Sequence, residues 1–279
     1  MAATYLDRIL AAHRYAAATR TVSELEAESE RAWGVAPTRD FAGSLVAAHG
    51  SGGLGVIAEV KRRSPSKPDL AVGLDPAALA AQYQAGGAAC LSVLTDTDFF
   101  GGSAEDLAAA RAATSIPLLR KDFTVCEADV VDARLMGADA VLLIAAALDD
   151  FELEEFHALA AELGMDALVE IHDEAELDRA LEANASLVGV NQRDLVTFEV
   201  DTDRAVRLAP LMPDGVLRVA ESGVRSTADA RRLAEAGYHA VLVGESLVTA
   251  PDPAAAVSAL RSARHTGSTG RARATPNRG

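Results

Sequence analysis

The chain has 279 residues, of which 49% are hydrophobic, enough for one large core and consistent with a single barrel-sized domain. Its formal net charge of -15 argues against a nucleic-acid or membrane-surface binder, so an anionic ligand would need a local cluster of cations. The isolated cysteines Cys90 and Cys126 indicate neither a disulfide framework nor a zinc site. No signal core is visible and no apolar run approaches the roughly 20 residues of a membrane span, so we expect a cytoplasmic protein.

Residues 1–50 are predicted to form a helical extension that precedes the main domain. Apolar residues within 5–10 fall on one helical stripe, and Ser23 followed by Glu26 matches a capping box at a second helix start. We expect this extension to pack on the main domain or to cover it as a lid.

Short apolar runs recur from residue 56 onward, separated by alanine-rich segments with apolar residues at helical spacing. The predicted helices include 76–85, 105–112, 149–163 and 227–236, with starts at Asp75-Pro76 and Ser226-Thr227. The apolar runs are VIAEVK from residue 56, CLSVLT from 90, PLLRKD from 117, AVLLIA from 140, ALVEI from 167, LVGVNQ from 187, LRVAES from 217 and AVLVGE from 240.

Eight strand–helix units predict a closed parallel (β/α)8 TIM barrel, an α/β fold, over residues 51–260. An open doubly wound sheet is the alternative, but regular units without a switch point favour closure. Residues 261–279 contain arginines, no acidic residue and little apolar surface, so they are predicted to be a disordered basic tail.

Polar or charged side chains end five of the predicted strands. Catalytic groups of a parallel barrel come from the carboxyl ends of its strands, so we expect these side chains to face one cavity. Mutual electrostatic shifts of pKa would then bring a lysine into use as a proton donor near neutral pH. No histidine joins the carboxylates, so we expect no metal. The five residues are Lys61, Lys121, Glu170, Asn191 and Glu221.

The first strand places Glu59 and Lys61 on the same side as Ile57, the side that a barrel buries. Burying an unpaired ionised group costs several kcal/mol or more, so these charges are expected to pair or to take part in chemistry. The alternative is an exposed edge strand that carries an ordinary ion pair.

Glycine-containing loops follow the last two predicted strands, at Glu221-Ser222-Gly223 and Gly244-Glu245-Ser246. In such barrels the backbone N–H groups of these loops often bind a phosphate. Ser64, after the first strand, could add a hydroxyl donor. The same residues also occur as ordinary turns.

These segments resemble the indole-3-glycerol phosphate synthase family of barrel enzymes in tryptophan synthesis. The resemblance runs from the extension through about Thr249 and implies the ring closure of 1-(2-carboxyphenylamino)-1-deoxyribulose 5-phosphate, with decarboxylation and dehydration, to indole-3-glycerol phosphate. This is a carbon–carbon lyase reaction that requires no cofactor and no metal. The matching segments are EVKRRSPSK, SVLTDTDFFGGS, PLLRKDF, GADAVLLIAAAL, LVEIH, GVNQRDL, ESGVRS and LVGESL.

The resemblance also implies catalytic roles. Lys121 would act as general acid on the ketone, and Glu170 as acid/base in the dehydration. Lys61 would hold the substrate carboxylate or donate a proton, with Glu59 paired to it.

Further roles concern orientation and binding. Asn191 and Glu221 would orient the substrate hydroxyls and the lysines. Arg193 and Ser222 would contact the substrate, and Phe99 and Phe123 would form apolar walls for its aromatic ring. The phosphate would be contacted by Ser64, Gly223, Gly244 and Glu245.

Four positions depart from the family's pattern. Pro68 stands where glycine is usual, Gln192 where a second asparagine is common, and Ala220 where a serine often precedes the glutamate. Residues 126–129, Cys-Glu-Ala-Asp, replace a stretch that usually carries Asp, Tyr and Gln. These changes bear on loop motion, rate or substrate breadth before they bear on the reaction.

Three other functions stay open. A phosphoribosylanthranilate isomerase would be expected to use a cysteine and an aspartate at strand ends, and neither cysteine ends the first strand. An aldolase would use Lys121 as a Schiff-base nucleophile, and a non-catalytic barrel would bind a phosphorylated metabolite as a sensor or scaffold. We expect a monomer that acts on a small phosphorylated substrate, with other tryptophan-pathway enzymes as candidate partners.

Overall fold

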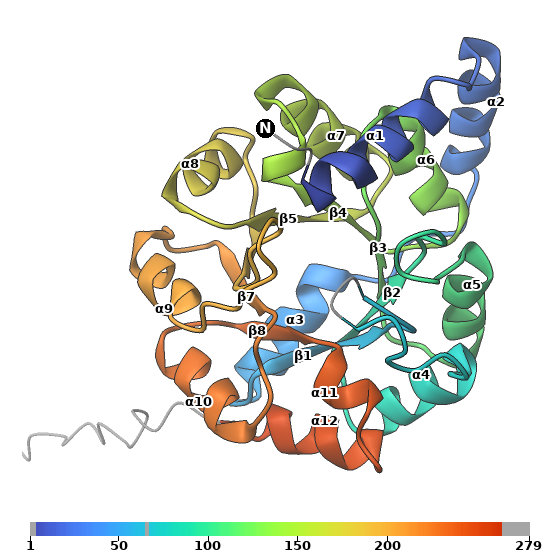
Figure 1. Cartoon of the computed structure of the whole chain (residues 1–279). Coiled ribbons are helices and arrows are strands. Elements are labelled where there is room, and N and C mark those ends of the chain that lie inside the picture. Colours follow the sequence, from blue (N-terminus) through green and yellow to red (C-terminus); the bar gives the residue numbers. More distant parts are fainter. Residues whose placement is uncertain (1–3, 65–66, 264–279) are drawn as a thin grey trace, which may run out of the picture.

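The structure is a computed structural model that describes residues 4–64 and 67–263. Eight parallel strands close into a barrel in chain order, with β8 paired to β1 (Figure 1). The predicted TIM barrel is therefore confirmed, and the open sheet is excluded. The strands are β1 (Gly55–Val60), β2 (Cys90–Leu94), β3 (Leu118–Lys121), β4 (Ala140–Ile144), β5 (Asp166–Ile171), β6 (Leu187–Asn191), β7 (Leu217–Glu221) and β8 (Ala240–Val243).

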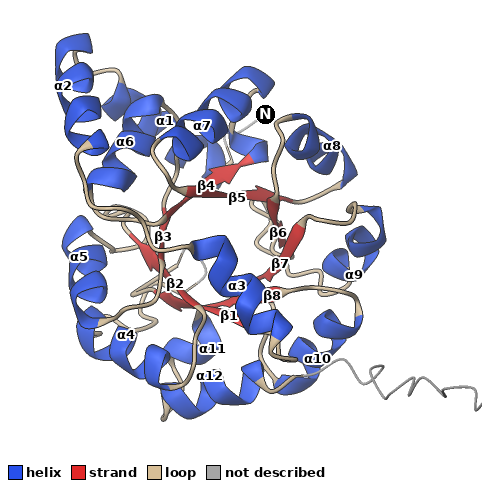
Figure 2. Ribbon diagram, turned by 180° about the vertical axis from the view of Figure 1, so that it is seen from behind, coloured by secondary structure: helices blue, strands red, loops and turns tan. Residues whose placement is uncertain are grey.

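Helices surround the barrel and follow the strands in alternation (Figure 2). Their starts obey the expected chemistry: the Asp75 carboxylate accepts from two backbone N–H groups of its helix, and Ser226 forms a capping box with Asp229. They are α4 (Pro76–Ala85), α5 (Ala104–Ala113), α6 (Glu127–Leu135), η1 (Ala145–Ala147), α7 (Asp150–Glu162), α8 (Glu174–Glu182), α9 (Arg204–Leu208), η2 (Ala209–Leu211), α10 (Thr227–Glu235), α11 (Glu245–Val248) and α12 (Pro253–Arg261).

Three further helices precede β1: α1 (Tyr5–Ala17), α2 (Val22–Trp33) and α3 (Phe41–Gly50). Helix α1 lies beside α7 and α2 packs against α6, whereas α3 crosses the opposite end of the barrel (Figures 1 and 2). The helices of the extension thus pack on both ends of the barrel, and whether any of them acts as a lid stays a prediction.

The capping box of α2 was predicted at the wrong residues. Thr21 and Glu24 form it, with the Thr21 N–H donating to Glu24 Oε2 at 2.8 Å, rather than Ser23 and Glu26. Both pairs have the required spacing of three residues. The earlier pair starts the helix at Val22, and Leu25 packs against the core.

The barrel interior changes character along its axis. At the amino-terminal end it is filled by strand residues such as Ile57 and Leu168, and Phe41 and Leu45 of α3 close it from below. Because side chains alternate along a strand, residues two positions later on the inner face lie at the carboxyl end, where the polar groups are.

The chain's end is only partly described. Helix α12 ends at Arg261, and Ala263 is buried against the core. The remainder of the predicted tail, residues 264–279, lies outside the described residues. In the described ranges, no helix combines the length and hydropathy needed to cross a bilayer.

Candidate active site

A cavity opens at the carboxyl end of the barrel. The predicted polar and charged side chains, at the ends of five strands, all line it where the period-two pattern placed them, so the structure brings them together. Those that line it are Glu59, Lys61, Lys121, Glu170, Asn191 and Glu221.

Lys121 stands at the centre of this group. Its Nζ donates to Glu170 Oε2 at 2.8 Å and lies 3.4 Å from Glu221 Oε2. Asn191 Nδ2 donates to Glu170 Oε1 at 2.9 Å, and Ser222 Oγ donates to Asn191 Oδ1 at 2.8 Å. Both glutamates are almost fully buried, so this is a water-poor charge network.

The surroundings shift the pKa values of the two glutamates in opposite directions. Burial would raise the pKa of Glu170, but the charges of Lys121 and His172 and the hydrogen bonds from Lys121 and Asn191 together outweigh burial and lower it. Burial raises the pKa of Glu221, and the charge of Glu170 adds to that rise, although Lys121 opposes it. Near neutral pH the site therefore holds one ionised carboxylate and one carboxyl group that retains its proton, which suits separate base and acid roles.

The surroundings of Lys121 keep its side chain protonated. Burial alone would lower its pKa, but the charges of Glu170, Glu221 and Glu59 and the hydrogen bond to Glu170 together exceed that effect and raise it. The expected shift of the Lys121 pKa toward neutral pH is not what the site shows, because several acidic side chains surround a single amine. Lys121 is a cation positioned to donate.

Glu59 and Lys61 form a close ion pair at the end of β1. A closed barrel has no edge strand, which excludes the exposed-edge alternative. Gly244, directly after β8, makes room for the pair, because a Cβ there would lie under 3.0 Å from Glu59 Oε1 and 3.1 Å from Lys61 Nζ. A side chain at this position would displace the ion pair.

The expected phosphate loops border the same cavity, and Ser64, Gly223, Gly244 and Glu245 all line it. Residues Ser222 and Gly223 both have positive φ, 64° and 76°. The carboxylate of Glu245 is engaged by Lys67 Nζ at 2.5 Å. Two guanidinium groups in the lining, Arg193 and Arg225, supply positive charge beside these loops.

One wall of the cavity is apolar. Phe123 contributes to it as expected, whereas Phe99 packs edge-on against Tyr5 with ring centroids 5.7 Å apart and does not line the cavity. Phe100 and Phe198 line it instead, and sequence reasoning missed both. They lie on loops, where alternation does not tell which side chain points inward.

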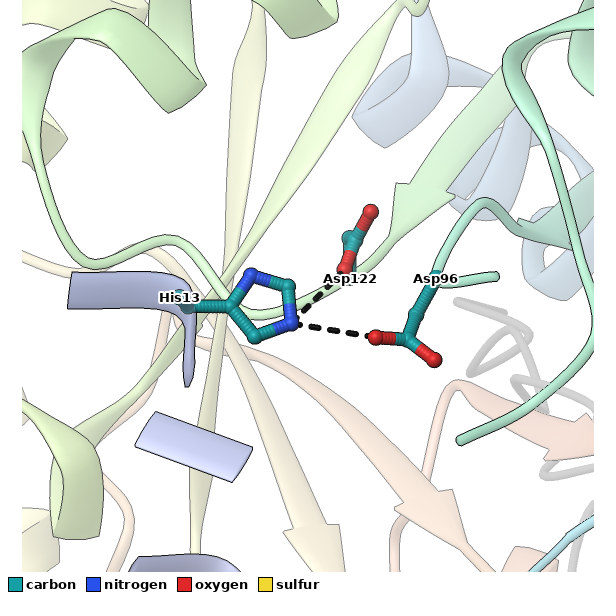
Figure 3. A group of neighbouring side chains, drawn as sticks. All are labelled: His13, Asp96 and Asp122. Atoms are coloured by element: carbon teal, nitrogen blue, oxygen red, sulfur yellow. Dashed lines mark hydrogen bonds and ion pairs between the residues drawn. The ribbon is translucent and has the colours of Figure 1, made fainter. Parts of the chain in front are cut away.

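Helix α1 bridges the mouth through contacts that sequence reasoning also missed. Tyr5 touches Phe198 as well as Phe99, with centroids 5.3 Å apart. His13 reaches from α1 to Asp96 after β2, with Nε2 to Oδ2 at 3.1 Å, and lies 3.9 Å from Asp122 Oδ1 (Figure 3). Burial lowers the pKa of His13, but the bond to Asp96 and the charges of both aspartates produce a net rise.

His13, Asp96 and Asp122 also form the one group in residues 4–64 and 67–263 with ligand atoms close enough to hold a metal ion, within 4.8 Å of one another. Both carboxylates already accept protein hydrogen bonds: Asp96 from backbone N–H groups, and Asp122 from Arg120 Nη2 at 3.0 Å. An imidazolium between aspartates explains the arrangement without an ion.

Comparisons with known proteins agree with this geometry. The family model described as indole-3-glycerol phosphate synthase matches residues 6–260. The chain belongs to this family.

Relatives named indole-3-glycerol phosphate synthase include those of Mycolicibacterium gilvum, 51% identical, and Mycolicibacterium smegmatis, 52% identical, each covering 92% of this chain and 94% of the relative. A Nocardioides relative of the same name is 57% identical over 205 residues, 74% of this chain and 79% of its own. Among solved structures, thiamine phosphate pyrophosphorylase from Pyrococcus furiosus superposes with a TM-score of 0.57 at 16% identity, covering 75% of this chain and 94% of that chain, which is a likeness of fold.

The departures from the family's pattern have defined places. Gln192 Nε2 donates to the Ser222 carbonyl at 2.8 Å and so supports the loop after β7. Ala220 points outward into the helix layer, and Pro68 lies in a turn. Cys126 is the N-cap residue of α6, and its thiol lies 3.4 Å from Asp129 Oδ2. None of these lines the cavity.

Proposed function

We propose that this protein catalyses the synthesis of indole-3-glycerol phosphate from 1-(2-carboxyphenylamino)-1-deoxyribulose 5-phosphate. The aryl carbon that carries the carboxylate bonds to the ketone carbon, carbon dioxide leaves, and the former ketone oxygen departs as water. The observation that carries the proposal is the Lys121 ammonium held between the buried carboxyl groups of Glu170 and Glu221 in the mouth of a family barrel.

The proposed roles follow from the protonation states. Lys121, held as a cation, donates to the ketone oxygen as the carbon–carbon bond forms. Glu170, held as a carboxylate, removes a proton from the former methylene carbon next to the nitrogen as the hydroxyl group leaves the former ketone carbon during dehydration. Lys61, fixed by Glu59, binds the substrate carboxylate or returns a proton to the departing oxygen.

Binding is proposed to divide along the cavity. The loops at Gly223 and Gly244, with Ser64, Ser222 and the backbone at Glu245, receive the phosphate. The apolar wall at Phe123 holds the aromatic ring. Arg193, Asn191 and Glu221 lie between these regions and orient the hydroxyl groups.

The aldolase alternative conflicts with this charge state. A Schiff base requires a neutral amine, and the neighbouring carboxylates keep Lys121 protonated. Treatment with borohydride in the presence of substrate is expected to leave Lys121 unmodified; a trapped adduct would favour the aldolase.

The test is turnover. Purified protein given the carboxyphenylamino substrate, with a chelator present, is expected to generate indole fluorescence, and Glu170→Gln is expected to lower kcat by about 10²–10⁴-fold. Substrate binding without product in the parent would favour the sensor or scaffold function instead.

Two further proposals concern the oligomeric state of the protein and its location in the cell. One chain supplies every proposed catalytic group, so we propose a monomer that needs no partner subunit for turnover. A cytoplasmic location and contact with other tryptophan-pathway enzymes are proposed from the pathway that the family's reaction serves.

A further inference from the structure

His172, the first residue after β5, lies behind Glu170 and outside the cavity lining. Its side chain is 12% exposed, and Nε2 lies 3.7 Å from Glu170 Oε1. That nitrogen is buried and has no hydrogen-bond partner among the described residues. An unpartnered ring nitrogen facing the proposed base is not explained by packing alone.

Glu176 determines which ring nitrogen of His172 carries a proton. Its Oε2 accepts from the backbone N–H of His172 at 2.8 Å and lies 3.0 Å from His172 Nδ1. A carboxylate only accepts, so Nδ1 carries a proton. Glu176 lies in the first turn of α8, where the helix dipole favours a negative charge.

With Nδ1 protonated, Nε2 has two states. A neutral ring points a lone pair at the Glu170 carboxylate, which is repulsive, whereas an imidazolium points an N–H at it, which is attractive. The arrangement therefore favours the imidazolium when Glu170 is ionised. It repeats the logic by which a buried carboxylate orients and stabilises a catalytic imidazolium.

We propose that Glu176 and His172 form a positioning dyad that holds Glu170 from behind as an ionised, oriented base. The proposal rests on the proposed function, because it concerns how Glu170 serves that reaction. His172 acts through Glu170 and does not touch substrate.

The charged groups that face His172 determine the pH dependence. Burial lowers its pKa, but the bond to Glu176 and the charges of Glu170 and Glu176 outweigh burial, while Arg204 of α9 opposes them; the net shift is upward. The active cationic form is thus present at lower pH and is lost as pH rises through this raised pKa.

The experiment compares kcat and KM from pH 6 to pH 9 for the parent, His172→Gln, Glu176→Gln and the control Glu174→Gln. Glu174 is exposed in the same helical turn. We expect His172→Gln to lower kcat about tenfold at pH 6, with KM nearly unchanged, and the ratio of parent to variant kcat to fall as pH rises. Glu176→Gln is expected to move the alkaline step to lower pH, and Glu174→Gln to match the parent.

A constant ratio of parent to His172→Gln kcat across the pH range would overturn the dyad, since a purely structural role has no reason to titrate. If His172→Gln does not fold, the alkaline step of Glu176→Gln decides alone, and an unmoved step overturns the proposal. Two measurements separate this proposal from the proposed function. An absence of turnover in the parent contradicts the function. An NMR titration of the His172 ring that does not shift between the parent and Glu176→Gln contradicts the dyad.

Discussion

Gly189 in β6 leaves the space that the Glu221 carboxylate occupies. A Cβ at this position would lie under 3.0 Å from Glu221 Oε1 and 3.2 Å from Leu168 Cδ1. The closest atom is the end of a side chain, so Gly189→Ala is expected to move that carboxylate while the strand stays in place. The contact of Glu221 with Lys121, now 3.4 Å, is then lost or rearranged.

The magnitude follows from the displacement. Restoring an ordinary contact requires a shift of about 1 Å, and misplacement of that size costs about 10²-fold in rate, or about 2.7 kcal/mol. We expect kcat of Gly189→Ala to fall by that factor, measured by indole fluorescence under saturating substrate. The melting temperature is expected to change little.

The control is Gly50→Ala, at the end of α3, where an added Cβ meets nothing within 4 Å. It should match the parent in kcat. A Gly189→Ala enzyme that folds normally and turns over within about threefold of the parent would contradict the placement of Glu221 in the reaction.

Other substitutions test the remaining parts of the site. Gly244→Ala is expected to displace Glu59 and Lys61 and to reduce kcat/KM by about tenfold or more, measured by steady-state kinetics; unchanged kinetics would oppose a role for this pair. His13→Gln is expected to destabilise the protein by about 1–2 kcal/mol in urea unfolding at pH 6 and by less at pH 8, because the raised pKa of His13 makes its ion pair a low-pH contribution; an equal loss at both pH values would contradict this. Glu221→Gln is expected to gain stability relative to the parent as pH rises from 5 to 8, because the raised pKa of this buried carboxyl makes its deprotonation destabilising; a relative loss in thermal melts would refute that charge state.

The sequence was most informative where regular periodicity applies. Lys121 and Glu170 were assigned to the mouth because each lies two positions after an inward leucine, and β3 and β5 follow that alternation. The number of strands, together with the chain-order pairing that short strand–helix units favour, was enough to predict closure.

What the sequence missed depends on distances between elements. His13, Asp96 and Asp122 meet only after α1 has docked across β2 and β3, and no local pattern joins positions so far apart. His172 follows its strand by one residue, but its significance depends on Glu176 returning from the next helix. Such contacts are set by tertiary packing, which overrides local pattern.

The central claim is that a protonated Lys121 drives the carbon–carbon bond formation. Its most direct test is the kcat of Lys121→Met, with substrate affinity measured separately and with Arg31→Met, an exposed position on α2, as control. We predict a loss of about 10²–10⁴-fold in kcat with affinity nearly retained and the control equal to the parent. Turnover of Lys121→Met close to that of the parent would contradict the claim.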